Sequence, residues 1–155
     1  MNLYKPKKLN KNVLRKILPN KLFIDFDNIN FYSQEFENIF KPKYTFSYDD
    51  EENENIFWIK TKFYSFCIYW YEYEDDICYL SDVKVKSKYQ NKGFGNILLK
   101  HAIQIAVKRK FEIIYLKCLA DSWIQKWYEK NGFELYEYVE IKNCSEKWVW
   151  LKRKV

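Results

Sequence analysis

Glycine is rare in this chain, and two of its three glycines are placed together. Gly93 and Gly95 stand between a segment rich in β-branched and aromatic residues and an amphipathic segment, where a strand ends and a helix begins. Backbone without side chains at such a junction lets free amide groups face one point at the positive end of the helix dipole, where an anion binds. The placement indicates a phosphate-binding turn, while a plain Gly-x-Gly turn stays open as the alternative.

The composition is that of a folded, soluble protein. Hydrophobic residues make up 48% and aromatic residues 21% of the 155 residues, too many for a disordered chain. A mean hydropathy of -0.56 adds a richly charged surface. This length fits a single domain over residues 1–155. Within it, residues 1–20 are expected to form a basic N-terminal arm with a short helix.

The net charge of +6 leaves the kind of partner open. It suits the phosphates of a nucleotide cofactor, a nucleic acid or solubility alone, and charge cannot choose among these. The basic N-terminal residues fit a solvated arm as well as a nucleic-acid contact. The geometry of a site has to decide, and nucleic acid is the less favoured partner.

The cysteines point to a reducing compartment. Cys67, Cys78, Cys118 and Cys144 are far apart, form no C-x-x-C pair and are accompanied by one histidine, His101. This spacing argues against a zinc or other metal site. The polar, basic start lacks the apolar stretch of a signal peptide, and no segment has the roughly 18 apolar residues of a membrane span. A cytoplasmic protein without disulfides or membrane contact is expected.

The first half of the chain is expected to be mainly strands. A first strand is predicted at 23–26, followed by a helix over 33–40 that begins at Ser33 and then an acidic loop over 49–54. Aromatic and β-branched residues then fill three segments separated by short polar breaks, which predicts an antiparallel meander. These segments are 56–62, 63–73 and 77–85.

The second half alternates helices and strands. A helix is predicted over 95–110, a strand over 113–118, and a second helix that opens at the capping-box sequence Ser122–Gln125 and stops at Asn131 and Gly132. Strands over 134–141 and 147–151 close the chain, and the last is either a core strand or a dimer edge. We therefore expect an α/β fold with a mixed, mostly antiparallel sheet of about six to seven strands flanked by helices.

Two motifs resemble the GNAT superfamily of acyl-CoA-dependent N-acetyltransferases. They are the turn Gln90–Gly95 after the strand that ends at Val85, and Tyr128–Phe133, which contains a Tyr ahead of Gly-Phe. The resemblance extends over about 57–138 and implies a GNAT-like fold that uses acetyl-CoA. The residues implied to contact this cofactor are Val83, Lys84, Val85, Gln90, Asn91, Lys92, Gly93, Phe94, Gly95 and Asn96.

The same resemblance implies two catalytic residues. Tyr128 stands where the family places the tyrosine that protonates the departing CoA thiolate. Asp82 is the candidate base, because polyamine acetyltransferases have a Glu-Asp pair where this chain has Ser81 and Asp82; a structural pairing of Asp82 with a nearby lysine is the alternative. Asp121 and Ile124 depart from the family, which often has Asn and Ala at these positions.

The leading interpretation is an N-acetyltransferase that moves an acetyl group directly from acetyl-CoA to an amine. The acceptor is a small molecule, such as a polyamine, or a protein lysine or N-terminus. The alternatives are an inactive acyl-CoA sensor and a basic, aromatic-rich nucleic-acid-binding module. Cys118 is not expected to carry the acetyl group, His101 is read as a packing or surface residue, and the chain is a monomer or a homodimer.

Overall fold

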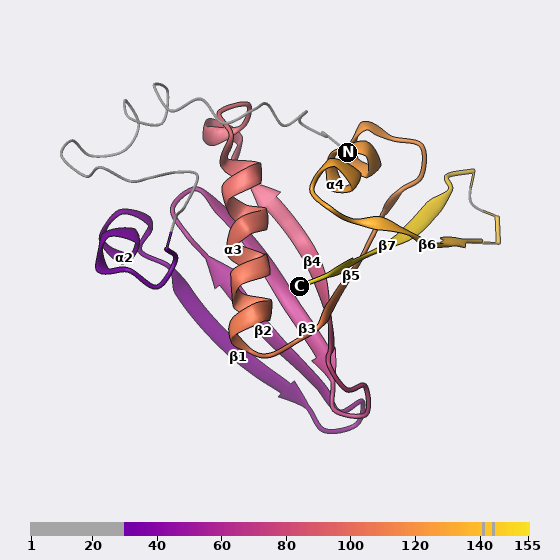
Figure 1. The fold of residues 1–155 in the computed structure, drawn as a ribbon, viewed down its shortest axis with the longest axis horizontal. Helices are drawn as coiled ribbons and strands as arrows, with labels where there is room; N and C mark the ends of the chain where they lie inside the picture. Colours follow the sequence, from indigo (N-terminus) through magenta and orange to yellow (C-terminus); the bar gives the residue numbers. More distant parts are fainter. Residues whose placement is uncertain (1–29, 141, 144) are drawn as a thin grey trace.

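The computed structural model describes residues 30–140, 142–143 and 145–155. The predicted basic arm and the predicted strand at 23–26 lie outside these residues. One sheet of seven strands runs through the described part of the chain in the order β1-β2-β3-β4-β5-β7-β6 (Figure 1). All neighbouring strands are antiparallel except β4 and β5, which are parallel. The strands are β1 Lys43–Asp49, β2 Glu54–Lys60, β3 Tyr64–Tyr71, β4 Ile77–Val85, β5 Ile113–Leu119, β6 Glu134–Val139 and β7 Trp148–Lys154.

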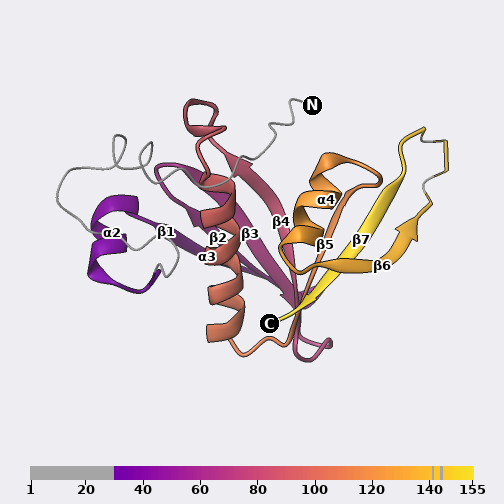
Figure 2. The same ribbon diagram turned by 45° about the horizontal axis from the view of Figure 1, so that its top comes forward.

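The described helices lie on one face of this sheet (Figure 2). α2 packs on α3 through Phe36 and His101, whose ring centroids are 5.1 Å apart. α4 meets the first turn of α3 through Trp127, whose indole nitrogen donates to the side-chain oxygen of Asn96 at 2.9 Å. The helices are α2 Gln34–Phe40, the 3₁₀ turn η1 Ser87–Tyr89, α3 Phe94–Lys108 and α4 Trp123–Lys130. No helix of the described residues is long and apolar enough to cross a membrane.

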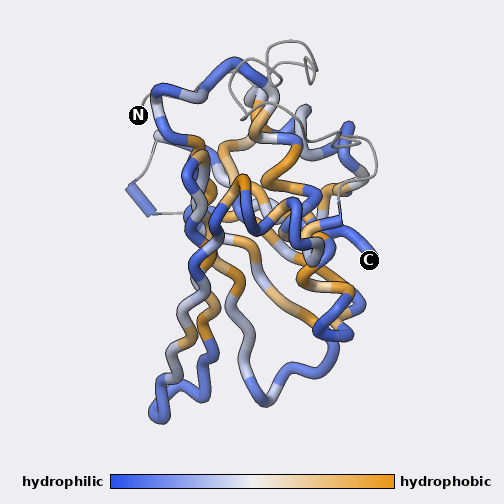
Figure 3. Tube along the Cα trace, turned by 90° about the vertical axis from the view of Figure 1, so that its left-hand side faces the viewer, coloured by the Kyte–Doolittle hydropathy of each residue, from blue (hydrophilic) through white to orange (hydrophobic). Residues whose placement is uncertain are grey.

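The core lies between α3 and the middle of the sheet. The hydrophobic segments gather in the interior in Figure 3, and the turns are hydrophilic. His101 of α3 is fully buried there, with its Nδ1 atom 2.7 Å from the Tyr64 hydroxyl and its ring stacked on Phe31. Burial lowers the pKa of His101 to about 3, so the imidazole is neutral. Of the two roles predicted for His101, a packing residue or a surface residue, the structure confirms the packing residue.

β4 is irregular in a way that matters for the site. Ser65 pairs with Lys84 and Cys67 with Ser81, so β4 has one more residue than β3 between these pairs. Asp82, in this bulge, has a left-handed φ of 52°. The extra residue resets the alternation of side chains, which is why Leu80 and Val85, five positions apart, are both buried against the core.

β4 and β5 are paired only where they begin. Their register joins Ile77–Tyr79 with Ile113–Tyr115, whereas β4 continues to Val85 and β5 to Leu119. The two strands diverge beyond this point (Figure 2). β3 still pairs with β4 as far as Val85, so the backbone groups of β4 that face β5 have no strand partner within the described residues.

The predicted fold class is confirmed, and one strand of the sheet was not predicted. The helix over 33–40 forms with Ser33 as its cap, and the strands of the meander begin and end within two residues of their predicted positions. The predicted acidic loop forms the turn between Asp49, which ends β1, and Glu54, which begins β2, whereas the strand β1 itself was not predicted. β7 lies between β5 and β6 and is thus a core strand, so the edges of the described sheet are β1 and β6.

Candidate active site

The turn between β4 and α3 is held by its own side chains. Gln90 donates its Nε2 hydrogen to the carbonyl oxygen of Val85 at 3.1 Å and so ties the turn to the end of the strand. Lys92 reaches back in the same way to the carbonyl oxygen of Lys88, also at 3.1 Å. Asn91 has a φ of 61°, a left-handed conformation that asparagine tolerates better than most residues. Gln90 and Lys92 therefore shape the turn directly.

The first turn of α3 has no side-chain cap. Its N-cap is Gly93, which has a φ of 91° and no side chain to accept a hydrogen bond from the helix amides. No acidic residue lies in the first turn, although acids are favoured there. The first amide groups of a helix have no partner inside the helix and need one from elsewhere. An anion of phosphate type fits this end of α3.

The end of β4 lies next to this turn. Val85 is buried, Val83 is half-buried and Lys84 is exposed, so the lysine has the most accessible side chain of the three. Lys84 and Val85 pair with Ser65 and Tyr64 of β3 on one side of the strand. The groups on the other side face the divergence from β5, where β4 has no strand partner among the described residues. The predicted strand and turn residues are thus contiguous at the start of α3.

Tyr128 lies on α4 with a largely buried side chain. It is 6% exposed and packs against Phe133, with 5.5 Å between ring centroids. Asn131 and Phe133 both donate their backbone N–H groups to its carbonyl oxygen, which closes the helix as the sequence predicted. Its neighbour Trp127 makes the bond to Asn96 described above, so the two sequence motifs meet in space.

Asp82 lies on the bulge of β4 and is exposed. Its Oδ2 atom accepts hydrogen bonds from the Cys67 thiol at 3.5 Å and from the Ser81 hydroxyl at 3.4 Å. Burial, and next the nearby Asp82 carboxylate, raise the pKa of Cys67 to about 12. Burial raises the pKa of Cys118 to about 12 as well. Both thiols are therefore protonated at neutral pH and are poor nucleophiles.

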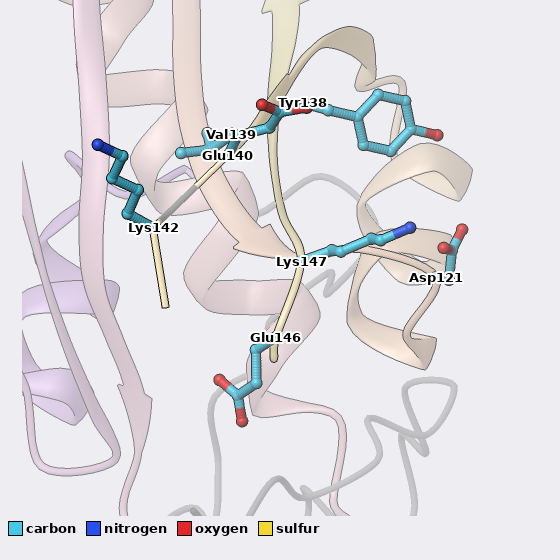
Figure 4. A pocket seen from close by; sticks show the side chains of 7 residues that line it. All are labelled: Asp121, Tyr138, Val139, Glu140, Lys142, Glu146 and Lys147. Atoms are coloured by element: carbon cyan, nitrogen blue, oxygen red, sulfur yellow. The ribbon is translucent and has the colours of Figure 1, made fainter. Parts of the chain in front are cut away.

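A cavity of about 690 Å³ lies beside the start of α4. Figure 4 shows the Lys147 side chain extending toward Asp121, while Lys142 points the other way. The charged groups that line the cavity are three carboxylates and two ammonium groups. It is lined by Asp121, Tyr138, Val139, Glu140, Lys142, Glu146 and Lys147. None of the residues predicted to contact the cofactor belongs to this set. Within the described residues, no cluster of three or more His, Cys, Asp or Glu side chains is arranged to hold a metal ion.

Sequence reasoning missed two parts of this region. Trp127 stands beside Tyr128 in the motif, but no spacing rule indicates that its indole bonds to Asn96, 31 positions earlier. The cavity is lined mainly by the connection between β6 and β7, where the residues follow no recognisable pattern. Of its lining, only Asp121 was singled out from the sequence, as a departure from the family, and an unusual φ of 56° marks its place at the entry to α4.

Comparison with known proteins identifies the family to which this fold belongs. The sequence profile of the acetyltransferase (GNAT) family matches residues 26–133. The chain therefore belongs to the GNAT acetyltransferase family, whose cosubstrate is acetyl-CoA.

Individual relatives are distant. The chain is 29% identical over 68 residues to the uncharacterized N-acetyltransferase CgeE of Bacillus subtilis, and the match covers 44% of this chain and about a quarter (26%) of that protein. An acetyltransferase of Bacillus subtilis in complex with CoA is similar in fold, with a TM-score of 0.55, 15% identity, and coverage of 74% of this chain and 97% of that one. The ribosomal-protein-S18-alanine N-acetyltransferase of Escherichia coli gives a TM-score of 0.53 at 20% identity, with 66% and 70% covered.

Proposed function

We propose that this protein transfers an acetyl group from acetyl-CoA directly to an amine while both substrates are bound. The observation that carries the proposal is the N-terminus of α3, which is capped by a glycine and lies beside the unpaired side of β4. An anion of the size of a pyrophosphate suits the amides of the turn and first helical residues, Gln90–Asn96. The extended arm of the cofactor would then follow the backbone of Val83–Val85.

Acetyl-CoA supplies an acetyl thioester, whose carbonyl carbon the amine attacks. The C–N bond forms, the C–S bond breaks, and the thiolate that leaves needs a proton. We assign the donor of that proton to the Tyr128 hydroxyl, because a phenol with an ordinary pKa of about 10 can protonate a departing thiolate near neutral pH. Backbone amides of β4 that face β5 are suited to stabilise the oxyanion.

An alkylamine must lose a proton before it attacks. Its ordinary pKa of about 10.4 means that forming the free amine at pH 7 costs about 4.6 kcal/mol. We assign the proton acceptor to Asp82, which is exposed and accepts hydrogen bonds only weakly at 3.4 and 3.5 Å. A water molecule held by Ser81 would extend its reach.

We assign the acceptor amine to the cavity beside α4. Its volume of about 690 Å³ lies in the range usual for small ligands. Its three carboxylates, from Asp121, Glu140 and Glu146, favour a cationic guest over an anionic one. It adjoins the entry to α4, the helix on which Tyr128 lies. Replacing Glu140 with Gln should raise KM for the amine and leave the affinity for acetyl-CoA unchanged.

An acyl-CoA sensor without turnover is the second candidate. The observation that favours it is Ser81, which stands where polyamine acetyltransferases have a glutamate, so that Asp82 is the single carboxylate at this point of β4. A sensor would bind acetyl-CoA as tightly as an enzyme and leave a broad panel of amines unacetylated.

Isothermal titration with acetyl-CoA tests the proposal first. Binding with a dissociation constant in the micromolar range is expected, and the absence of heat at millimolar cofactor would refute both the enzyme and the sensor. Acetylation assays with polyamines, lysine-containing peptides and small metabolites then separate the two. Titration of single-stranded RNA at several salt concentrations is the control for nucleic-acid binding, which should be weak and unaffected by acetyl-CoA.

A further inference from the structure

β1 is an edge strand that nothing in the described part of the chain covers. It pairs with β2 on one side and is the first strand in the order of the sheet. All seven of its residues are exposed, including Tyr44, Phe46 and Tyr48, whose side chains are 41%, 54% and 42% accessible. Natural edge strands avoid association through prolines, bulges or charges in the strand. The pairing of β1 with β2 is regular, and its five central residues are uncharged.

The charges at the two ends of β1 do not suit its partner within the chain. Lys43 lies directly opposite Lys60 of β2, and Asp49 lies directly opposite Glu54. Like charges at facing positions of an antiparallel pair are destabilising. The pairing of β1 with β2 therefore gives no reason for Lys43, whereas the Asp49 carboxylate also accepts from the N–H of Glu51 in the turn.

The sequence of β1 is complementary to itself when it is reversed. In an antiparallel pair of two copies centred on Phe46, Lys43 of each copy lies opposite Asp49 of the other. Tyr44 then faces Tyr48, Thr45 faces Ser47, and Phe46 faces its own counterpart. Every pair in this register is of a kind that stabilises sheets: opposite charges, aromatic pairs and hydroxyl pairs. A symmetric interface of this kind requires such self-complementarity.

We propose that β1 is a dimerisation edge, at which two copies of this chain pair antiparallel about a two-fold axis at Phe46. The sheets of both copies then form one continuous sheet. β1 is separated from β4 by β2 and β3, so the contact leaves the turn at Gly93 free. A single pair of strands buries less surface than a standard protein interface, so the dimer forms in a concentration-dependent way.

Sedimentation equilibrium of the full chain from about 5 to about 500 µM tests this proposal. The wild-type chain should shift from monomer to dimer. Lys43→Asp places two aspartates opposite each other at both ends of the interface, and Asp49→Lys places two lysines there. Each change should weaken self-association at least about tenfold, and an equimolar mixture of the two variants should form a heterodimer with both charge pairs restored.

The variants are chosen so that the monomer should still fold. Lys43→Asp faces Lys60 of β2 and removes a like-charge pair, so its thermal stability should not fall. Asp49→Asn is the control for Asp49→Lys, because its side-chain oxygen still accepts from the N–H of Glu51, the bond that Asp49 makes at 2.9 Å. A wild-type monomer at about 500 µM, dimers that tolerate both reversals, or a mixture that stays monomeric would each overturn the proposal.

Cross-linking checks the register. Phe46→Cys places two thiols directly opposite each other and should give a disulfide-linked dimer on mild oxidation, beyond the level of the wild-type chain. In Tyr48→Cys the new thiol faces Tyr44 of the other copy, so little cross-linking should follow. Equal cross-linking of the two variants would refute the register. Acetyl-CoA titration of each variant should match the wild-type protein, because β1 is remote from the cofactor turn.

Discussion

α3 and α4 begin at corresponding places in the fold but have different N-caps. Each helix follows one of the two parallel strands of the sheet, β4 or β5. The cap of α4 is Ser122, whose hydroxyl oxygen accepts from the N–H of Gln125 at 3.2 Å, and the Gln125 side chain accepts in turn from the N–H of Asp121 at 2.7 Å. The cap of α3 is Gly93, which offers no such oxygen. The chain caps the start of α4 with its own side chain and leaves the start of α3 without a side-chain cap.

The contact between the two ends shows why both matter. Trp127 of α4 donates to Asn96 in the first turn of α3, so the capped helix carries Tyr128 to the side of the uncapped one. In our proposal the capped helix positions the proton donor, and the uncapped helix end binds the anion. The following predictions change one side of this contrast at a time.

The largest effect is expected from the residue that the capped helix carries. Tyr128→Phe removes the proposed proton donor and should lower kcat by about 100-fold, within the usual range for a general acid. The dissociation constant of acetyl-CoA, measured by titration, should change little. Tyr73→Phe removes a hydroxyl from a 70% exposed tyrosine elsewhere and is the control. Equal activity of Tyr128→Phe and the wild-type enzyme would exclude Tyr128 as the acid.

The stability of the fold should depend on pH through His101, in the buried middle of α3. The folded protein holds His101 with a pKa of about 3, and the unfolded chain has an ordinary value of about 6.5, so below that pH the unfolded state takes up a proton that the folded state does not. The contribution of His101 to the free energy of unfolding is therefore fully present above about pH 6.5. It is lost as the pH falls below that value, and the free energy of unfolding decreases by about 2 kcal/mol between pH 7.5 and pH 5.

Urea unfolding at several pH values measures this effect. His101→Gln retains hydrogen-bonding groups but does not titrate, so its stability should vary less over the same interval. A wild-type stability that is constant from pH 7.5 to pH 5 would contradict the neutral, buried imidazole.

Giving α3 a charged cap tests the open end directly. Gly93→Asp places a carboxylate where we propose that the pyrophosphate binds, and should weaken acetyl-CoA binding by about tenfold or more. Gly93→Asn is the matched control, because it shares the size of the side chain and the cost of the left-handed backbone but lacks the charge. If titration gives the same affinity for the two variants, the charge at this end is irrelevant to the cofactor.

The smallest effect should come from removing the cap of α4. Ser122→Ala deletes the acceptor for the Gln125 amide and should lower the free energy of unfolding by about 1 kcal/mol. Acetyl-CoA affinity should stay within about twofold of the wild-type value, since α4 is not assigned to the phosphates. Thermal unfolding and titration of one sample measure both. A large loss of affinity without loss of stability would reverse the roles assigned to the two helices.

The fold was largely predictable from the sequence, with one instructive failure. The helices and central strands have strong local signals, such as the apolar periodicity of α3 and the serine caps at Ser33 and Ser122. β1 was missed although Tyr44, Phe46 and Tyr48 alternate with small polar residues, because its last residue, Asp49, was assigned to the acidic loop. The capping box was also modified, since Gln125 bonds to Asp121 instead of Ser122.

The roles assigned to the residues of the candidate site stay predictions, and the structure shows where these residues lie in the fold. The turn at Gln90–Gly95 follows from residue types with strong backbone preferences, which act locally and can be read from the sequence. Asp82 on a bulge and the cavity beside α4 depend on strand register and on a connection without a motif. The hydrogen bond between Trp127 and Asn96 joins helices that are far apart in the chain.

The amino-acid sequence by itself determined where the backbone turns and which helix lacks a side-chain cap. Glycine and serine fix these features because they affect the backbone conformation and hydrogen bonding of residues only a few positions away. Only the tertiary structure decided that β4 and β5 diverge beyond Tyr79, that Tyr128 lies on a helix bonded to α3, and that β1 is an open edge. These features depend on which strands pair and on where the pairing stops. Such choices are made by contacts between distant segments, which no local pattern of residues records.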